Sequence, residues 1–542
     1  MAMETTEPIS LDVEHLPDDT AFLKALIVDL VAALKDNQVH IEKLRHQLYD
    51  VVRRHYGRKS ETLTSGQQEL FRQLIDEQLA QIPELPVTPK AEPKVRKGHG
   101  RRKPSKTLPK KVERYPLPES QKICNCCHEP LKWVGEETRS LVDYVPASLR
   151  VREQIREKWA CGKCERIVSS ELPDQPIQRC MAGEGLLANV IVSKYSDGLP
   201  LNRLAAGPYR REGFEVSSST MCGWVAQSAE LLAPLGASLK ENVLQSETLH
   251  ADDTPVPVLD ILENKKRTTE EKEAEAEEPP GKRKIRKSRL WAWLGDKDHP
   301  HTVFDYAPDW SQKWPQDFLG KWSGFLQADG YKGYDAIYGK DPVTLKSRVL
   351  EAACWSHVRR KFYDARTTDK AHANEGLAFI GRLYDVESLA VNLDAEARRK
   401  FRQKHSKPVL NVFKKWLDAL ALVTLPKSGL GEAIGYALRQ WTALRRYAYY
   451  GHLAIDNNAA ENALRCVAVG RKAWLFCGSD AGGRHAALFY SIVASCKRNK
   501  VDPFIYLRDV LGRIASHPAS KIRDLLPAYW TPKQTTPALT SA

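Results

Sequence analysis

The chain has 542 residues, of which 42% are hydrophobic and 28% are charged, and it carries a formal net charge of +14 with a pI of about 9.1. This length exceeds what one hydrophobic core supports, so we expect several globular domains. The positive charge favours a polyanionic partner, most often nucleic acid, although a basic enzyme without one is an equal alternative. Residues 1–20 are acidic and polar rather than a secretory signal, and we expect a cytoplasmic protein with no membrane partner.

Residues 1–60 are predicted to form an N-terminal coiled coil. Hydrophobic residues between 20 and 52 recur in alternating steps of four and three, which is the spacing of a coiled-coil seam. The seam positions are Leu23, Ile27, Leu30, Leu34, Asn37, Ile41, Leu44, Leu48 and Val51. This pattern indicates a homo-oligomer, with one amphipathic helix packed on its own domain as the alternative.

Residues 61–119 are predicted to be a basic, proline-rich linker. The stretch has almost no apolar residues between 94 and 111, so it cannot bury a core. Arg101, Arg102 and Lys103 lie at its centre and are candidates for contact with DNA phosphates. A plain solvated linker is the alternative interpretation.

Residues 120–175 contain two Cys-x-x-Cys pairs and are predicted to form a zinc-binding domain. The pairs are Cys124 with Cys127 and Cys161 with Cys164. Two such pairs about thirty residues apart can supply four thiolates to one tetrahedral Zn²⁺. Because four protein ligands leave no open position, this zinc is expected to be structural.

Residues 176–240 are predicted to form a helical domain of the helix-turn-helix type. Helices are expected at 185–196, 199–211 and 217–232, with a break at Gly213 and an N-cap within Val216–Thr220. Two helices joined by a short turn that contains glycine are typical of this DNA-binding motif. A plain helical hairpin is nearly as good an interpretation.

Beyond residue 245 the pattern changes to short strands. We expect strands at 247–259, 290–295, 302–306 and 324–328, with residues 263–289 forming a disordered, highly charged loop. From about 343 onward the sequence predicts mostly helix. Asp252 lies on the first strand, Asp329 follows the last, and Glu461 lies where a helix is expected to begin.

Three carboxylates from two strands and a helix can converge on divalent cations. Hard oxygen ligands suit Mg²⁺, and two such ions can clamp the attacking and leaving oxygens of a phosphoryl transfer. Each acid alone is weak evidence for such a site, because an aspartate before a glycine often only forms a turn. Asp253, next to Asp252, is an alternative first ligand.

The chain resembles the large transposase of the insertion-sequence sixty-six family over nearly its whole length. The segments that carry the resemblance are Leu249–Val256, Gln327–Tyr331, Cys354–Phe362, Ile455–Glu461 and Gly470–Phe476. The coiled coil, the motif Tyr56–Glu61 and the four cysteines match the family's N-terminal plan too. The chain departs from the family pattern at Asn462, Cys466 and Ala473, none of which is an expected metal ligand.

The resemblance implies a multidomain α/β protein whose residues 241–490 form an RNase H-like core, a mixed sheet flanked by helices. A helical insertion is expected at 365–450 and a C-terminal helical region at 491–542. The implied catalytic acids are Asp252, Asp329 and Glu461, which would hold two Mg²⁺ with Mn²⁺ as an alternative ion. Asp253 is the weaker candidate because family members often carry Glu there.

The implied activity is cleavage and strand transfer of DNA, with transposon ends and target DNA as partners in the bacterial nucleoid. Small accessory proteins of the same element are expected to assist. Candidate DNA contacts are His357, Arg359, Arg360, Lys361, Arg465, Arg471 and Lys472. A structural histidine paired with Cys354 or Trp355 is the alternative for His357, and a solvated face is the alternative for the basic residues. A catalytically inactive zinc DNA-binding regulator and a nuclease without strand transfer are the rival functions.

Overall fold

The protein is described by a computed structural model that covers residues 174–259, 285–339 and 347–532, together with 149–154, 158–160, 167–169 and parts of a helix between 24 and 41. The chain divides into two compact units, residues 1–85 with 156–542, and residues 86–155. Several sequence predictions lie outside the described residues. These are the linker residues Arg101, Arg102 and Lys103, the zinc candidates Cys124, Cys127, Cys161 and Cys164, and loop residues 263–284.

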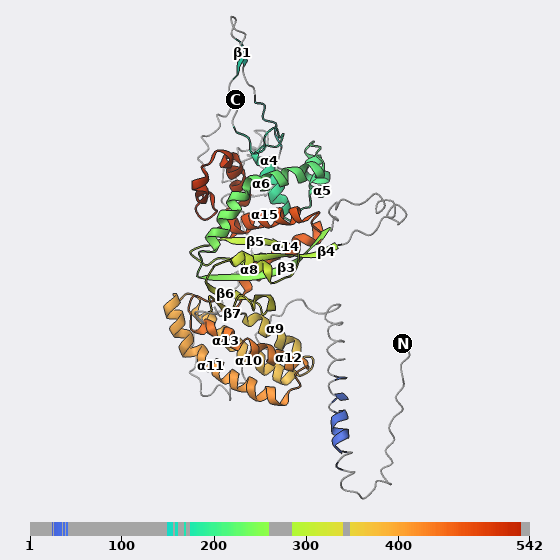
Figure 1. Cartoon of the computed structure of the whole chain (residues 1–542), viewed down its shortest axis with the longest axis vertical. Helices are drawn as coiled ribbons and strands as arrows, with labels where there is room; N and C mark the ends of the chain where they lie inside the picture. Colours follow the sequence, from blue (N-terminus) through green and yellow to red (C-terminus); the bar gives the residue numbers. More distant parts are fainter. Residues whose placement is uncertain are drawn as a thin grey trace, which may run out of the picture. The chain divides into compact units, whose positions relative to one another are not determined.

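A five-stranded mixed sheet lies at the centre of the larger unit (Figure 1). Its order is β5-β4-β3-β6-β7. The strands are β3 (Thr248–Leu259), β4 (Ile285–Leu294), β5 (Thr302–Ala307), β6 (Gly324–Ala328) and β7 (Val349–Ala353). β4 is antiparallel to β3 and to β5, whereas β6 is parallel to β3 and to β7. The mixed sheet that the sequence predicted is therefore present.

One group of helices packs against the sheet and shares a hydrophobic core with its strands. The members are α4 (Glu184–Tyr195), α5 (Leu201–Leu204), the π-helical turn Ala205–Tyr209, α6 (Ser218–Val243), α14 (Asn458–Trp474), α15 (Asp480–Arg498) and α16 (Pro503–Arg513). Short elements complete this part: α8 (Lys313–Leu319) and the 3-10 turns Lys332–Tyr334, Ile514–Ser516 and Ala519–Leu525. Helices before and after the sheet in sequence therefore stabilise one common core.

A second core belongs to the helices beyond β6 and β7, where Figure 1 draws them in olive to orange. They are α9 (Trp355–Ala365), α10 (Lys370–Ala390), α11 (Ala395–Val423), α12 (Gly429–Arg439), α13 (Trp441–Arg445) and the 3-10 turn Arg446–Ala448. Arg402 is almost fully buried in this group, where it pairs with Glu387 and donates to the backbone oxygens of Tyr447 and Leu453. Residues 365–450, for which a helical insertion was predicted, are mostly helical, while α9 begins before them at Trp355.

The strands at 247–259, 302–306 and 324–328 agree with the prediction to within one residue, but two other predictions were wrong. The charged loop was expected to continue to residue 289, whereas Ile285–Arg289 belongs to β4 and pairs with β3. A basic strand is stable here because Arg286 and Arg289 find carboxylates at Asp480 and Asp253. The strand β7 was also missed in a region expected to be helical.

The predicted N-cap before α6 is confirmed, since the Ser217 hydroxyl accepts a hydrogen bond from the backbone N–H of Thr220 at 3.0 Å. α6 then runs beyond the predicted end at 232 as far as Val243. Its buried residues include Trp224, Leu232 and Leu239, all in the same core as the sheet. The helix-turn-helix itself stays a prediction.

The N-terminal helix presents apolar side chains to solvent. Among its described residues, Ile27, Leu30, Leu34 and Ile41 are exposed, and all four are positions of the predicted seam. A two-stranded antiparallel ladder of β1 (Lys158–Ala160) and β2 (Ile167–Ser169) flanks the positions of Cys161 and Cys164. No helix in the described part of the chain is both long and apolar enough to cross a bilayer.

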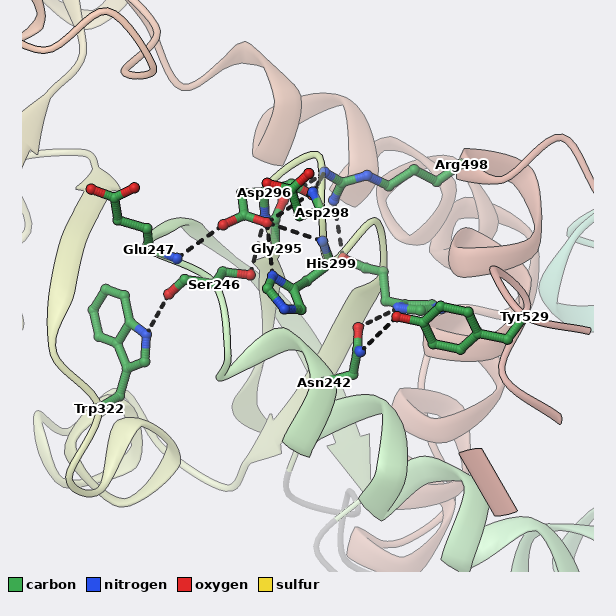
Figure 2. Close-up of polar contacts among 11 residues, drawn as sticks. Asn242, Ser246, Glu247, Gly295, Asp296, Asp298, His299, Trp322, Arg498 and Tyr529 are labelled. Carbon is green, nitrogen blue, oxygen red and sulfur yellow. Dashed lines mark hydrogen bonds and ion pairs between the residues drawn. The ribbon is translucent and has the colours of Figure 1, made fainter. Parts of the chain in front are cut away.

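A polar cluster ties the C-terminal residues to the sheet, as Figure 2 shows. Asp296, in the turn between β4 and β5, accepts from the backbone N–H groups of Glu247 and His299 at 2.9 and 3.0 Å. Arg498, at the end of α15, donates to the backbone oxygens of Gly295 and His301. The cluster therefore fixes the start of β3 relative to α15.

Candidate functional site

Two aspartates lie just beyond the parallel ladder that joins β3 to β6. β3 and β6 pair with Leu249 opposite Leu326 and His250 opposite Gln327. Continuing this register by two residues brings Asp252 level with Asp329, which directly follows β6. Because side chains alternate between the faces of a strand, Asp252 and its neighbour Asp253 point to opposite faces of the sheet.

The third acid is carried to the same place by α14. Asn457, the fully buried residue that precedes this helix, donates from its side-chain amide to the backbone oxygen of Ala251 at 2.8 Å. Its side-chain oxygen lies 3.0 Å from Nδ1 of His250. These bonds fix the start of α14 on β3, and Glu461 follows in the first turn of the helix.

Asp252 has other acids as neighbours. Its pKa is raised from 3.8 to about 7, chiefly by burial and in smaller part by the negative charges of Asp329, Asp253 and Glu461. Burial also raises the pKa of Asp329, and the nearby His357 opposes that rise. Such mutual repulsion among buried carboxylates is relieved when a cation lies between them.

His357 and Glu461 face one another. His357 Nδ1 lies 3.8 Å from Glu461 Oε1, and both atoms are buried without a hydrogen-bond partner. Together with Cys354 they form the group in the described residues whose metal-ligand atoms all lie within 4.8 Å of one another. Asp252 and Asp329 are not part of that tight group. Burial raises the pKa of the Cys354 thiol to about 12, so it is a neutral thiol that accepts the backbone N–H of Asn457.

The basic residues of α9 lie on two sides of that helix. His357, Arg360 and Lys361 have the three- and four-residue spacing of one helical face. Arg360 lies 3.9 Å from the second oxygen of Glu461, and its side chain is 46% exposed. Arg359 lies two residues from His357, so it points in another direction from the acids.

Asp253 has partners of its own on the other face of the sheet. One carboxylate oxygen accepts from Arg289 at 2.8 Å and the other accepts from the indole N–H of Trp310 at 3.3 Å. The guanidinium of Arg289 lies over the Trp310 ring, which stacks on Tyr331 with centroids 4.5 Å apart. These contacts leave Asp252 as the aspartate of the pair that faces Glu461.

The candidate DNA-contact residues of α14 differ from one another in their surroundings. Arg465 and Lys472 are exposed, whereas Arg471 is half-buried. Arg471 donates to the hydroxyl of Thr254 at 3.0 Å and to the backbone oxygen of Pro255. It therefore attaches the end of α14 to β3, two residues beyond Asp252.

A groove of about 440 Å³ lies away from these acids, between α6, α8, α15 and β5. Its charged lining consists of Glu230, Lys240, Asp305 and Arg484. β5 is the edge strand, two strands from β3, so the groove is not continuous with Asp252.

His250 and Asn457 have roles that the sequence did not predict, although both lie in segments that carry the family resemblance. Asn457 stands at the N-cap of α14, but its side chain makes no capping bond and reaches β3 instead. The pairing of Asp253 with Arg289 was hidden because Arg289 fell in the predicted loop. In both cases the sequence shows only a polar residue close to a candidate acid. It does not identify the distant residue with which that side chain pairs.

Comparison with known proteins identifies related chains. A family model described as "Transposase IS66 family" matches residues 179–485, and one described as "IS66 C-terminal element" matches residues 491–528. A third, the "zinc-finger binding domain of transposase IS66", matches residues 121–165. These matches cover the sheet, its helices, the C-terminal helices and the four cysteines.

Proteins of similar length in Sinorhizobium fredii resemble the whole chain. Protein y4qI is 31% identical over 562 residues, covering 96% of this chain and 99% of its own. Protein y4hP is 29% identical over 518 residues, covering 91% of this chain and 88% of its own, and protein y4jD is 29% identical over 544 residues, covering 97% and 99%. From these matches, the chain belongs to the IS66 transposase family and carries that family's zinc-finger domain.

Proposed function

We propose that this transposase cuts and joins DNA at an Asp252–Asp329–Glu461 site. The observation that carries the proposal is the placement of the acids: the β3–β6 register sets Asp252 level with Asp329, and the bond from Asn457 to Ala251 brings the start of α14, with Glu461, to the same part of β3. The sheet order, with three antiparallel strands followed by two parallel ones, supports an RNase H-like core. The half-buried position of the acids suits a site that a DNA backbone can reach.

The residues present fit divalent cations. Asp252, Asp329 and Glu461 offer hard carboxylate oxygens, the type of ligand that Mg²⁺ and Mn²⁺ prefer. Glu461 Oε1 is buried and has no hydrogen-bond partner in the protein, as expected for an atom meant for a ligand. When bound, two such cations supply Lewis-acid activation of the attacking oxygen and stabilise the leaving oxygen.

The neighbouring residues orient the acids and the substrate. Asn457 holds the start of α14 on β3, and Arg289 keeps Asp253 on the opposite face. Arg360 and Lys361 on α9, and Arg465 and Lys472 on α14, would neutralise DNA phosphates near Glu461. His357 would contact the scissile phosphate region, and Arg359 the backbone farther along. No protein nucleophile is required for either step.

The N-terminal regions would bind and pair the transposon ends. The exposed seam residues Ile27, Leu30 and Leu34 support a coiled coil that joins two protomers. The zinc finger with four cysteine ligands, the basic linker and the helices of 184–243 would recognise the terminal repeats. Small accessory proteins of the same element would assist.

The test is an assay of cleavage and joining with the full chain. The substrate is a duplex carrying the inverted repeat that borders the gene for this chain, with supercoiled plasmid as target. Asp252→Asn, Asp329→Asn and Glu461→Gln should each abolish Mg²⁺-dependent cleavage and joining while retaining DNA binding. Asp253→Asn is the matched control, and it should retain measurable cleavage because Asp253 faces away from Glu461.

The rival functions give different results. Cleavage by the parent without any joined product would favour a nuclease. DNA binding without chemistry, in Mg²⁺ and in Mn²⁺, would favour a regulator. Loss of cleavage in Asp253→Asn with retention in Asp252→Asn would refute the proposed assignment of the first ligand.

A further inference from the structure

The segment after α14 contains a strained turn. Leu475 has a positive φ of 65° with a ψ of −51°, and the backbone N–H of Phe476 bonds the oxygen of Trp474 at 2.8 Å. This is a γ-turn with positive φ at its centre, a rare and strained conformation for a residue with a side chain. The turn is stapled to β3, because Cys477 exchanges backbone hydrogen bonds with Pro257 and Leu259.

The strained turn holds two large apolar side chains in solvent. Leu475 is 61% exposed and Phe476 is 41% exposed. Ile285, at the adjacent start of β4, is exposed as well. A strained turn that exposes apolar side chains does not stabilise the free protein. It therefore points to a binding partner that covers these side chains.

The same surface leads back to the proposed catalytic acids. Positions Asn462, Arg465, Val469, Lys472 and Phe476 are all exposed and follow one another in steps of three and four. The first four form one outward face of α14, and Phe476 lies just beyond Leu475, whose positive φ ends the helix. The face carries Arg465 and Lys472 but no acidic residue, so its charge complements a polyanion.

From the contacts of this turn we infer that Leu475 and Phe476 form a wedge that inserts between base pairs of the transposon end. This inference rests on the proposed function and names how the same site grips its substrate. Leu475 lies about 21 Å along α14 from Glu461, at 1.5 Å per residue. That span corresponds to about six base pairs of B-form DNA at 3.4 Å each. Arg465 and Lys472 would hold the phosphates between the two points.

This surface is better suited to binding DNA bases than to binding another protein. Apolar side chains between basic residues are the arrangement by which proteins unstack a base step and kink the duplex. A protein interface would instead be expected to be poor in lysine, whereas the exposed Lys472 lies four residues before Phe476. Unstacking would bend the end of the element so that its scissile phosphate reaches Asp252 and Glu461.

The experiment measures base unstacking separately from chemistry. The full chain, with Glu461→Gln to prevent cleavage, is bound to a terminal-repeat duplex carrying 2-aminopurine at successive positions within about ten base pairs of the cut site. We expect a rise in fluorescence near the sixth pair, lost in Phe476→Ala and Leu475→Ala. Leu422→Ala, which removes an 87% exposed leucine at the end of α11, is the matched control and should keep the rise.

A rescue experiment distinguishes a wedge from a structural role. With Glu461 intact, Phe476→Ala should slow cleavage of fully paired DNA by about ten- to a hundredfold, the effect of losing one aromatic contact with a base. A mismatch at the fluorescent position should restore most of the lost cleavage rate, because a mismatched base costs less free energy to unstack. A folding defect would not be rescued by altered DNA.

The outcomes separate this inference from the proposed function. Parental cleavage without any fluorescence rise, or without rescue of Phe476→Ala by a mismatch, would overturn the wedge alone. A fluorescence rise in a chain that never cleaves would refute the proposed function alone. If Phe476→Ala changes self-association but neither DNA readout, the turn is a protein interface and the wedge is refuted.

Discussion

The side-chain amide of Asn457 donates a hydrogen bond to the backbone oxygen of Ala251, the residue before Asp252, at 2.8 Å. One buried side chain thus joins the helix that carries Glu461 to the strand that carries Asp252. Its oxygen also meets His250, and its backbone N–H meets the thiol of Cys354. The relative position of two of the proposed catalytic acids depends on these bonds.

Asn457→Ala is expected to impair both stability and catalysis. Removing the amide leaves the Ala251 oxygen and the His250 ring without their buried partner, which costs about 1–3 kcal/mol per group. The melting temperature and the cleavage rate should both fall, while DNA binding is retained. Asn458→Ala is the control, since Asn458 is exposed and its amide reaches only Asp456. Equal effects of the two substitutions would contradict this role for Asn457.

Asp252→Asn is expected to stabilise the metal-free protein at high pH. The pKa of Asp252 is about 7 in the folded chain against an ordinary 3.8, so the folded state holds its proton more tightly than the unfolded state. The stabilising effect of that proton is complete below pH 4 and is lost as the pH rises through 7. At pH 8 the neutral asparagine should therefore raise stability by about 2–4 kcal/mol, and below pH 4 it should not.

Thermal melting in the presence of EDTA measures this difference at pH 4 and pH 8. Asp298→Asn, an exposed carboxyl in the turn after β4, is the control. Added Mg²⁺ should raise the melting temperature of the parent at pH 8 but not that of Asp252→Asn. A lower melting temperature for Asp252→Asn at pH 8 in EDTA would argue against mutual repulsion among the acids.

The C-terminal residues are expected to detach in acid. His301 is fully buried, and its ring lies 2.7 Å from the side-chain oxygen of Asn242. The side-chain amide N–H of Asn242 donates to the hydroxyl of Tyr529 (Figure 2 shows Asn242 and Tyr529). Burial and the charge of Arg498 lower the pKa of His301 to about 4, from an ordinary 6.5. Because the unfolded state binds the proton more tightly, stability is full above pH 6.5 and declines as the pH falls toward 4.

Hydrogen exchange of residues 519–530 between pH 7 and pH 4.5, corrected for the intrinsic pH dependence, measures this detachment. Protection should decrease with acid in the parent, and less so in His301→Gln, which cannot gain the charge. His299 lies in the same cluster but is less buried, so His299→Gln is the matched control and should leave the acid response of 519–530 in place. Equal acid responses of the parent and His301→Gln would contradict the assignment.

Zinc removal is expected to affect DNA binding and not the catalytic core. The zinc-finger domain matches residues 121–165, and the sheet begins only at Thr248. Cys124→Ser, or chelation, should release one Zn²⁺ per chain and weaken binding to the terminal repeat. Circular dichroism of the helices should change little. A large loss of helix on chelation would show that zinc supports the core as well.

The central strands could be predicted because their patterns are local. Gly324–Ala328 is an apolar run that ends at Asp329, and the spacing of its residues alone indicates a buried strand. β7 was missed because it is only five residues long and a single residue separates it from α9. Arg289 was assigned to a loop because it lies in a charged run. Nothing in that run indicates that Arg289 will pair with Asp253 on a neighbouring strand. Pairings such as Asn457 with Ala251 join residues about two hundred positions apart, and a single sequence contains no local signal for them.

The central claim is that Asp252, Asp329 and Glu461 hold divalent cations, and a change of metal specificity tests it most directly. A thiolate is a soft ligand that binds Mg²⁺ poorly and accepts Mn²⁺ or Cd²⁺. Cleavage of the terminal-repeat duplex is therefore measured for Asp252→Cys and Glu461→Cys in each ion, with Asp253→Cys as the control. The account predicts that the first two are inactive with Mg²⁺ and regain cleavage with Mn²⁺ or Cd²⁺, whereas the control keeps the parent's preference. Undiminished Mg²⁺-dependent cleavage by Asp252→Cys or Glu461→Cys would contradict it.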